Sequence, residues 1–529
     1  MFFRTFEILL VALCCLAGAF RGVHIFQLNR YQLTSYQRWL RVNGDRFLKG
    51  HVLIGFVGTV AKLYLPVLLS LFIAVESTRS AVASWMTLVL FALATAGYAY
   101  LEHYAPAAKP FGLTHRVCRL LAATLAVDLL AVLLLALVGI PVYFAFALAP
   151  YTVLVSGKIM DPIETRINAR FYEEARRKIR ARHDLTVIGI TGSFGKTLTK
   201  FMLREMLSTQ YKVLATPASF NTPMGISRVI NDQLTEEHQV FIAEMGAQHK
   251  GDIKHLVKLV NPKYGLITVI GDQHLKTFGS LANAAQTKYE LVEGLPQDGA
   301  AFFGTSGQYI DRLYAVCGKE KYRAGVNGAE TDYMRASEIS FDAKGTRFML
   351  ECEDGGRIWC RTRLLGSYNV QNLALAAAVA RRMGLTMEEI GAAIERMQTF
   401  EKKLQLIPGE RVVIDDSLNR VPDGAVEALK VLEAFPGRRI LVTPGLSVED
   451  RPEKADEVNF AFGTQVGGRA DFVILVGEKK NLQPIYRGIM SVRFPKNAVR
   501  FVADMEDAED VLNEISGKGD SVLYESTVE

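Results

Sequence analysis

Apolar residues are concentrated in the first 157 positions of the chain, where they form long runs separated by short polar stretches. A helix needs about 20 mostly apolar residues to cross about 30 Å of hydrocarbon. The pattern therefore predicts a transmembrane region over residues 1–157, with about five spans. The expected spans lie near residues 6–20, 52–76, 81–101, 118–139 and 141–157.

The first apolar run admits a second interpretation, a cleaved signal peptide. Arg4 would precede the apolar core, and Ala17-Gly18-Ala19 would be the cleavage site. The stretch over residues 21–49 weighs against it, because it carries six Lys and Arg residues with Asp45 as the only acid. Such loops stay in the cytoplasm. Five spans then place everything after residue 157 in the cytoplasm.

Residues 158–184 follow the last apolar run and are strongly basic. Eight Lys and Arg residues stand against four Asp and Glu residues over 158–183. The segment predicts a basic juxtamembrane helix that lies along the anionic inner leaflet. An ordinary helix with one solvated face fits the same residues equally well.

From Leu185 onward, short apolar runs rich in β-branched residues alternate with helical segments, which is typical of an α/β fold. The first run, Leu185 to Ile190, predicts a buried strand. It is followed by Thr-Gly-Ser-Phe-Gly-Lys-Thr over residues 191–197 and by a helical run over 198–207. A strand, a glycine-rich turn with Gly-Lys-Thr and a helix, in this order, are the context that a phosphate-binding loop requires.

The residues of this loop have distinct expected roles in binding ATP. Gly192, Ser193 and Gly195 allow backbone N–H groups to approach phosphate oxygens. Lys196 would bridge the β- and γ-phosphates, and Thr197 would ligate Mg²⁺. The alternative is a glycine-rich turn that binds nothing, since Ile190 stands where the general motif has glycine.

Glu244 ends a second apolar strand, residues 240–243. A carboxylate at a strand end beside a phosphate loop is a natural ligand for Mg²⁺. The competing interpretation is an exposed acid at the end of a strand.

The overall composition excludes several classes of function. The chain has 529 residues, of which 50% are hydrophobic and 22% charged, which excludes a disordered chain. The formal net charge of +6 is small for this length, so we expect no nucleic-acid partner. None of the six cysteines forms a Cys-x-x-Cys pair, which argues against a zinc site and against a disulfide framework.

Seven motifs in the second part of the chain resemble, in order, those of the Mur ligases, which build the peptide stem of peptidoglycan. The resemblance is closest to the MurF-type branch, which adds D-alanyl-D-alanine. It extends from about residue 184 to the end. The motifs cover residues 189–197, 219–225, 243–247, 273–280, 287–290, 366–372 and 414–419.

The resemblance implies a two-domain catalytic part behind the membrane region. Residues 185–405 would form the central ATP-binding domain of a Mur ligase, and residues 406–529 its C-terminal Rossmann-like domain, which closes over ATP. Five membrane spans stand where the family's UDP-sugar-binding domain is found. A bacterial-type inner membrane, with the catalytic domains in the cytoplasm, follows from this picture.

The resemblance also implies roles for four residues around the phosphates. Glu244 matches a metal ligand, and His274 a ligand of a second Mg²⁺. Lys288 matches the lysine that many Mur ligases carry as a carbamate, which turns a cation into an oxygen ligand; a lysine on a helix surface is the alternative. Asn221 matches a loop that contacts substrate. The expected catalytic set consists of Lys196, His274 and Lys288.

Three further positions complete the expected nucleotide site. Asn372 matches a family position near the nucleotide, although helix capping is its simpler role. Asp416 matches an aspartate near the ATP ribose, although it could be a solubilising acid at a strand end. Lys403 replaces a usual arginine near the phosphates, and lysine does not reproduce the fork of arginine. Residues 304–306 also depart from the family's pattern near adenine.

These features predict an ATP-dependent acid–amino-acid ligase, anchored in the membrane, that acts in cell-wall or related envelope polymer synthesis through an acyl phosphate. Its expected partners are ATP, Mg²⁺, a membrane lipid or a lipid-linked or UDP-linked envelope precursor, and an amino acid or dipeptide. Two alternatives stay open. One is a catalytically degenerate scaffold or nucleotide sensor, and the other is a ligase that resembles poly-γ-glutamate synthases.

Overall fold

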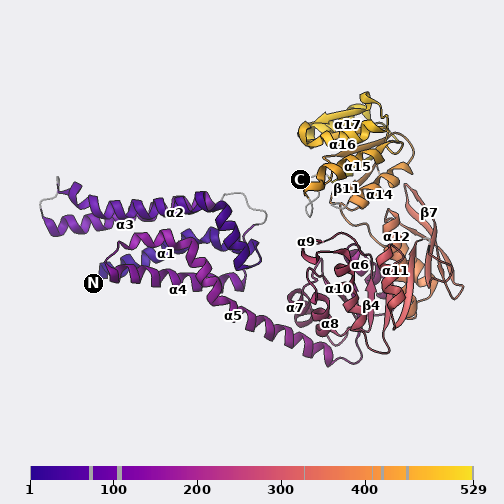
Figure 1. Cartoon of the computed structure of the whole chain (residues 1–529), viewed down its shortest axis with the longest axis horizontal. Helices are drawn as coiled ribbons and strands as arrows, with labels where there is room; N and C mark the ends of the chain where they lie inside the picture. Colours follow the sequence, from indigo (N-terminus) through magenta and orange to yellow (C-terminus); the bar gives the residue numbers. More distant parts are fainter. Residues whose placement is uncertain are drawn as a thin grey trace. The chain divides into compact units, whose positions relative to one another are not determined.

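The computed structural model describes residues 2–70, 75–103, 110–273, 275–326, 328–407, 409–418, 422–447 and 452–526. The chain divides into two compact units, Met1–Arg170 and Phe171–Glu529. The first unit is helical, and the second contains two β-sheets with their helices (Figure 1). The predicted order of helical region and α/β region is confirmed.

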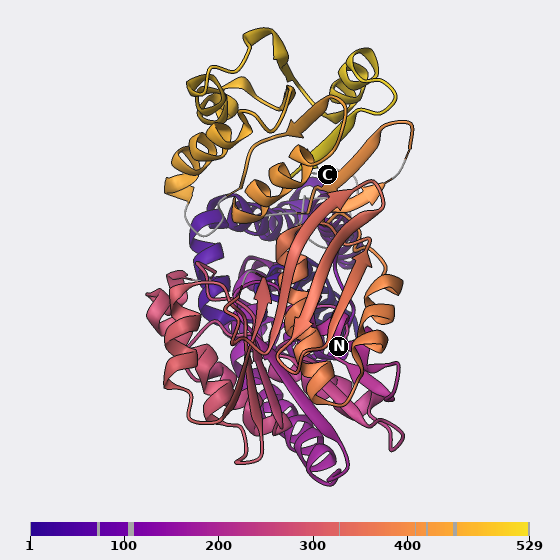
Figure 2. The same cartoon turned by 90° about the vertical axis from the view of Figure 1, so that its right-hand side faces the viewer.

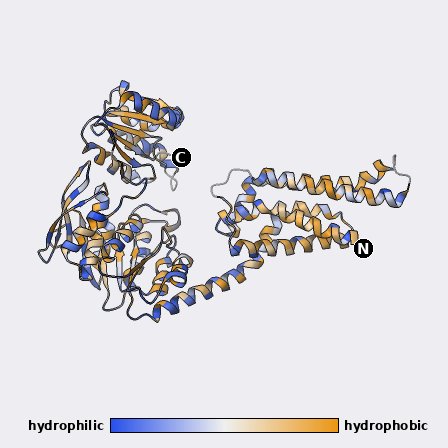
Figure 3. Cartoon of the chain, turned by 180° about the vertical axis from the view of Figure 1, so that it is seen from behind, coloured by the Kyte–Doolittle hydropathy of each residue, from blue (hydrophilic) through white to orange (hydrophobic). Residues whose placement is uncertain are grey.

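Long apolar helices build the first unit, and Figure 3 shows them mostly in the colours of hydrophobic residues. Five helical segments of the described residues are long and apolar enough to cross a membrane: Phe2–Leu28, Phe47–Leu69, Glu76–Glu102, His115–Val138 and Val142–Arg180. This number agrees with the number of spans expected from the sequence. The helices are α1 (Phe2–Leu28), α2 (Leu33–Leu69), α3 (Glu76–His103), α4 (His115–Val138), the 3₁₀ turn η1 (Val142–Phe144) and α5 (Ala145–Arg180).

The bounds of these helices differ from the predicted spans at several places. The stretch 21–49, expected as a loop, is mostly helical, since α1 continues to Leu28 and α2 begins at Leu33. A break does occur at Gly139, whose φ of 79° ends α4. The single helix α5 contains both the fifth apolar run and most of the basic segment after it. Sequence periodicity does not predict where one helix continues into the next segment, because helix boundaries are the least reliable part of such a prediction.

The packing of α1 bears on the signal-peptide interpretation. The helix is 27 residues long, more than the apolar core of 7–15 residues that is typical of a signal peptide. Its Ala19 and Val23 are fully buried and share a cluster with Ala149 and Val153 of α5. This packing fits an integral helix of the bundle.

Several charged side chains inside the helical unit are paired. Lys62 donates a hydrogen bond of 2.8 Å to Glu7, which also accepts one of 2.7 Å from the hydroxyl of Tyr143. Arg119 binds Glu164 through two hydrogen bonds, of 2.7 and 3.0 Å. Charges in an apolar surrounding are costly unless they are paired, so each pair offsets the cost of burying its charges.

The larger sheet of the second unit has nine strands in the order β2-β3-β1-β4-β5-β6-β7-β8-β9. Neighbours from β2 to β7 run parallel, and β7, β8 and β9 pair antiparallel. Figure 2 shows the long strands of this sheet side by side. The strands are β1 (Thr186–Thr191), β2 (Val213–Ala215), β3 (Val240–Glu244), β4 (Tyr264–Ile267), β5 (Ala300–Phe303), β6 (Glu320–Val326), β7 (Met334–Asp342), β8 (Gly345–Cys352) and β9 (Arg357–Thr362).

Helices connect the successive strands from β1 to β6, since parallel pairing needs crossover connections. The central helix is α12, whose alanine-rich stretch from 372 to 380 is buried along its whole length. It belongs to the same apolar cluster as Leu203 and Met206 of α6. The helices are α6 (Lys196–Leu207), α7 (Pro223–Gln233), α8 (Asp252–Val260), α9 (Leu275–Phe278), α10 (Leu281–Glu293), α11 (Gln308–Val316), α12 (Ser367–Arg382) and α13 (Met387–Arg396).

The smaller sheet has six strands in the order β10-β11-β15-β12-β13-β14, all parallel except the β10–β11 pair. The strands are β10 (Gln405–Ile407), β11 (Val412–Asp416), β12 (Arg439–Thr443), β13 (Phe472–Val476), β14 (Val499–Val502) and β15 (Ser521–Glu525). The helices are η2 (Pro452–Lys454), η3 (Lys496–Ala498), α14 (Pro422–Glu433), α15 (Ala455–Val466), α16 (Lys479–Ser491) and α17 (Met505–Ile515).

Candidate nucleotide and metal site

The phosphate-binding loop lies at the carboxyl end of β1. This strand pairs with β3 on one side and β4 on the other, so that Ile190 lies opposite Glu244 and Thr191 opposite Ile267. In open parallel sheets ligands bind outside the carboxyl ends of such strands. The fold thereby brings the loop and Glu244, which are about 50 residues apart in sequence, to the same edge of the sheet.

Backbone conformation explains why glycine occupies two positions of the loop. Gly192 and Gly195 have φ values of 150° and 81°, which other residues rarely adopt. A Cβ atom at Gly195 would lie 2.7 Å from the side-chain oxygen of Asn372. The structure therefore places Asn372, on α12, against the loop.

The capping role considered for Asn372 is wrong. The N-cap of α12 is Gly366, so Asn372 lies within the helix and is buried there. Asn369, in the first turn of the same helix, donates a hydrogen bond of 2.7 Å to the carbonyl of Leu365. Binding of nucleotide by Asn372 remains a prediction. The position of its side chain beside the loop is compatible with that role.

Lys196 begins α6 and folds back over the loop. Its ammonium group donates hydrogen bonds of 2.8 and 2.9 Å to the carbonyls of Gly192 and Ser193. Burial lowers its pKa to about 8, because the charged form loses its hydration. The Ser193 hydroxyl accepts a hydrogen bond of 2.9 Å from the backbone N–H of Gly271, which ties the loop to the segment after β4.

Glu244 is the centre of a buried polar cluster. One carboxylate oxygen, Oε2, accepts hydrogen bonds from Thr197 Oγ1 at 3.0 Å and from Lys200 Nζ at 2.9 Å. The other, Oε1, accepts one from Asn221 Nδ2 at 3.1 Å. Glu244 is 1% exposed, so the interpretation as an exposed strand-end acid is wrong. The predicted residues Thr197, Asn221 and Glu244 thus meet at one carboxylate.

Lys200 is the residue of this cluster that sequence reasoning missed. It is fully buried, and its ammonium also donates to the carbonyl of Ala218. Burial lowers its pKa, and the charge of Glu244 opposes that shift. A signal was present in the sequence, because Lys200, Leu203 and Leu207 occupy positions i, i+3 and i+7 on the buried face of α6. A lysine in an apolar stripe needs a buried partner.

The donor set fits a magnesium ion bound together with nucleotide. Thr197 and Glu244 offer hard oxygen ligands next to the loop, which Mg²⁺ prefers to combine with phosphate oxygens and water. In the described part of the chain no three His, Cys, Asp or Glu side chains are grouped so that they could hold a metal alone. His274 lies outside the residues that the structure describes.

Lys288 is not a surface residue. It lies on α10, is 3% exposed, and its Nζ lies 4.9 Å from the centroid of the Phe278 ring. Burial, and to a lesser extent the nearby charge of Lys196, lowers its pKa to about 8. A buried lysine with a depressed pKa is partly neutral and hence nucleophilic near neutral pH. The alternative of a plain helix-surface lysine is wrong.

The two predicted residues of the second sheet have different environments. Asp416 is buried and accepts a hydrogen bond of 2.9 Å from the backbone N–H of Leu404, so it is not a solubilising acid. Lys403 is exposed. The contact of Asp416 fixes the chain where it enters this sheet, and the nucleotide roles of both residues remain predictions.

The segment that departs from the family pattern near adenine is well packed. Thr305 Oγ1 donates a hydrogen bond of 2.8 Å to the side-chain oxygen of Gln371, and the backbone N–H of Val326 donates one of 2.8 Å to the same atom. Gln371 precedes Asn372 on α12. The altered segment is thereby linked to the helix that lies against the phosphate loop.

Comparison with family models identifies both sheets. The Mur ligase middle domain matches residues 190–380, and the Mur ligase glutamate ligase domain matches residues 395–526. The chain belongs to the Mur ligase family. This confirms the resemblance inferred from the seven motifs.

Individual relatives are distant. The chain is 30% identical over 299 residues to UDP-N-acetylmuramoyl-tripeptide–D-alanyl-D-alanine ligase of Escherichia coli (strain K12), which covers 56% of this chain and 65% of that protein. It is 28% identical to the protein of that name from Bacillus subtilis (strain 168), over 64% of this chain and 73% of that protein. The alignment with the first relative thus leaves about a third of that protein's length unmatched.

A solved structure shows the same fold. The MurF ligase of Thermotoga maritima in complex with ADP superposes with a TM-score of 0.59 at 21% identity, covering 68% of this chain and 80% of that one. At this identity the likeness establishes the fold alone. Membership in the family means a Mur-type, ATP-dependent ligase ancestry for residues 190–526 of this chain.

Proposed function

We propose that this chain is a membrane-anchored, ATP-dependent ligase that joins a carboxylate to an amine in the synthesis of a cell-wall or related envelope polymer. One observation carries the proposal. The carboxylate of Glu244 is held by Thr197, Lys200 and Asn221 at the end of the strand beside the phosphate loop. Burying such a charge cluster costs desolvation energy. Its presence therefore favours a site that is in use over one that has lost its function.

Lys196 and the loop would bind the phosphates of ATP. The Lys196 ammonium exchanges its contacts with the carbonyls of Gly192 and Ser193 for phosphate oxygens and stabilises charge on the transferred phosphoryl group. Thr197 and Glu244 would hold Mg²⁺, which neutralises charge on the phosphates when bound. The acceptor carboxylate oxygen attacks the γ-phosphorus, and ADP leaves.

The second step forms the amide bond. The amine attacks the carbonyl carbon of the acyl phosphate, inorganic phosphate leaves, and the amine loses a proton. Asn221, which reaches the cluster from the loop before α7, would contact the acceptor. Lys288, as a carbamate, and His274 would supply further ligands to metal. Asn372, Lys403 and Asp416 would complete the nucleotide site.

The domain limits belong to the same proposal. Residues 1–157 would anchor the protein in a bacterial-type inner membrane, with residues 158–184 as a basic juxtamembrane helix. Residues 185–405 and 406–529 would be the central and C-terminal catalytic domains on the cytoplasmic side, where ATP is. A lipid-linked or UDP-linked envelope precursor is the proposed acceptor, and an amino acid or dipeptide the proposed amine donor.

One other function has observations in its favour, and a second differs from the proposal only in its acceptor. A nucleotide sensor or scaffold is favoured by the changed segment 304–306 and by the exposed position of Lys403, where the family usually has arginine near the phosphates. A ligase of the poly-γ-glutamate-synthase type would use the same phosphate loop and differ in its acceptor. The first alternative predicts binding of ATP without turnover, and the second predicts turnover with an acceptor of γ-linked glutamate.

Turnover with defined acceptor pools tests the proposal. Purified full-length protein is mixed with Mg²⁺, ATP, an amino-acid and dipeptide pool, and either lipid-linked or UDP-linked precursors, and ADP release is measured. We expect release that depends on both an acceptor and an amine and that is lost in Lys196→Ala. Lys250→Ala, an exposed lysine, is the matched control. ADP release that is equal in wild type and Lys196→Ala would contradict the proposal.

A further inference from the structure

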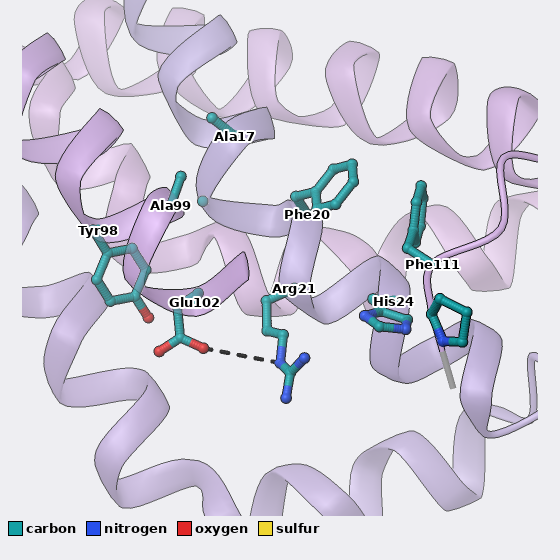
Figure 4. Close-up of a pocket in the computed structure, with 10 residues that line it drawn as sticks. Ala17, Phe20, Arg21, His24, Tyr98, Ala99, Glu102 and Phe111 are labelled. Atoms are coloured by element: carbon teal, nitrogen blue, oxygen red, sulfur yellow. Dashed lines mark ion pairs between the residues drawn. The ribbon is translucent and has the colours of Figure 1, made fainter. Parts of the chain in front are cut away.

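The helical unit contains a cavity of about 630 Å³ between α1, α3 and the segment before α4. Its lining includes the small residues Ala17 and Ala99. Its volume lies in the range of 300–1,000 Å³ that is typical of ligand sites. Figure 4 shows the side chains that line it.

One wall of the cavity is apolar and rigidly held. The rings of Phe20 and Phe111 pack with their centroids 4.4 Å apart. The segment that carries Phe111 is fixed to α1, because the Gln27 side chain donates a hydrogen bond of 2.7 Å to the carbonyl of Gly112 and accepts one of 3.3 Å from its N–H. Such a wall suits the hydrocarbon part of a ligand.

The other wall carries two opposite charges. Arg21 Nε and Glu102 Oε2 lie 4.0 Å apart, with side chains that are 11% and 23% exposed (Figure 4). This separation is too long for a hydrogen bond. It contrasts with the Arg119–Glu164 pair of the same unit, which closes into two hydrogen bonds of 2.7 and 3.0 Å. Arg21 and Glu102 thus form an ion pair in the lining of the cavity without a direct hydrogen bond between them.

The position of this pair along the helices suits the level of lipid headgroups. Glu102 is the last residue of the third apolar segment, and Arg21 is the first of the six basic residues over 21–49. Charged residues at the end of a span lie at the interface between hydrocarbon and water.

We infer that this cavity binds a membrane lipid whose headgroup carries a phosphate and a primary ammonium, that is, an aminophospholipid of the phosphatidylethanolamine class. The phosphate would accept hydrogen bonds from Arg21, the ammonium would donate to Glu102, and the start of an acyl chain would lie on Phe20 and Phe111. The charges of Arg21 and Glu102 cancel, so a zwitterionic headgroup bound between them leaves no buried charge uncompensated. An anionic headgroup would face Glu102 without a counter-charge.

The inference rests on the membrane insertion in the proposed function and not on ligase chemistry. Extraction of membranes with alkaline carbonate tests insertion separately. Protein that stays in the membrane but fails the lipid test would overturn the inference alone.

Lipid binding to the detergent-solubilised full-length protein tests it by native mass spectrometry. Phosphatidylethanolamine, phosphatidylglycerol and phosphatidylcholine with identical chains are titrated. We expect phosphatidylethanolamine to bind roughly tenfold more tightly than phosphatidylglycerol, the factor that one charge-assisted hydrogen bond is worth. Glu102→Gln should abolish this preference, whereas Glu76→Gln, an exposed acid at the other end of α3, should leave it unchanged.

Two filling variants keep the test decisive. Ala99→Phe and Ala17→Leu place side chains in the cavity and should each reduce lipid binding at least tenfold; either suffices if the other does not fold. The inference would be overturned if both filling variants bound the lipid as tightly as wild type does. It would also be overturned if the wild-type protein bound phosphatidylethanolamine and phosphatidylglycerol with equal affinity. Soluble phosphoethanolamine that binds as tightly as the lipid would overturn the lipid as the source of the headgroup.

Discussion

Replacing Lys200 by methionine isolates the buried ion pair at the proposed metal site. Methionine has a similar length, so Lys200→Met removes the charge without leaving a large cavity. Glu244 then keeps its hydrogen bonds from Thr197 and Asn221 but loses its counter-charge at 2.9 Å. Removing one partner of a buried pair costs about 3–5 kcal/mol. For a domain of about 200 residues this lowers the melting temperature by roughly 6–20 °C.

The assay is thermal unfolding of the full-length protein in detergent, followed by intrinsic fluorescence, with and without Mg²⁺. Added Mg²⁺ should recover part of the loss, because a cation that binds Glu244 in the folded state replaces the charge of lysine. The double variant Lys200→Met/Glu244→Gln should be more stable than Lys200→Met, since glutamine leaves no uncompensated charge. Lys250→Met is the control at an exposed lysine.

Two results would refute this reasoning. The first is a melting temperature of Lys200→Met within about 1 °C of wild type, which is less than 1 kcal/mol for a domain of this size. The second is strict additivity of the two substitutions in the double variant, because residues in one ion pair must couple.

Three further predictions concern the loop, the buried lysine and the helical unit. Gly195→Ala should abolish ATP binding in a calorimetric titration, because its φ of 81° disfavours alanine and its Cβ would collide with Asn372; retained affinity would contradict the loop geometry. Lys288 has a pKa of about 8, well below the ordinary 10.5, so its amine becomes neutral as the pH rises through 8. Carbamate formation, trapped by alkylation, should therefore have its midpoint near pH 8. A midpoint above about pH 10 would contradict the depressed pKa. Gly58→Leu should lower the melting temperature of the helical unit, since its Cβ would lie 2.7 Å from the Phe91 ring; an unchanged melting curve would argue against this packing.

Local patterns in the sequence predicted several elements of the fold. The apolar run 185–190, the glycine-rich loop and the helical run 198–207 appear in the structure as β1, the loop and α6. These succeed because periodicity and turn chemistry act over a few residues. The continuity of α5 through the basic segment was not predictable in the same way, since polar and apolar stretches of one helix read as separate elements.

The environment of site residues was less predictable than their identity. Glu244 and Thr197 were chosen from spacing, and the structure brings them within hydrogen-bond distance. The burial of Lys288 and Asp416 depends on helices and strands distant in sequence, so no local pattern reports it. Lys200 was missed because a buried charge is visible only once its partner, 44 residues later, is placed beside it.

The most direct test of the central claim is calorimetric titration of the full-length protein with ATP in the presence and absence of Mg²⁺. The account predicts Mg²⁺-dependent binding by wild type that is lost in Lys196→Ala and retained in Lys250→Ala. Folded wild-type protein that binds no ATP, or that binds it equally well after Lys196→Ala, would contradict the assignment of the loop as the ATP site.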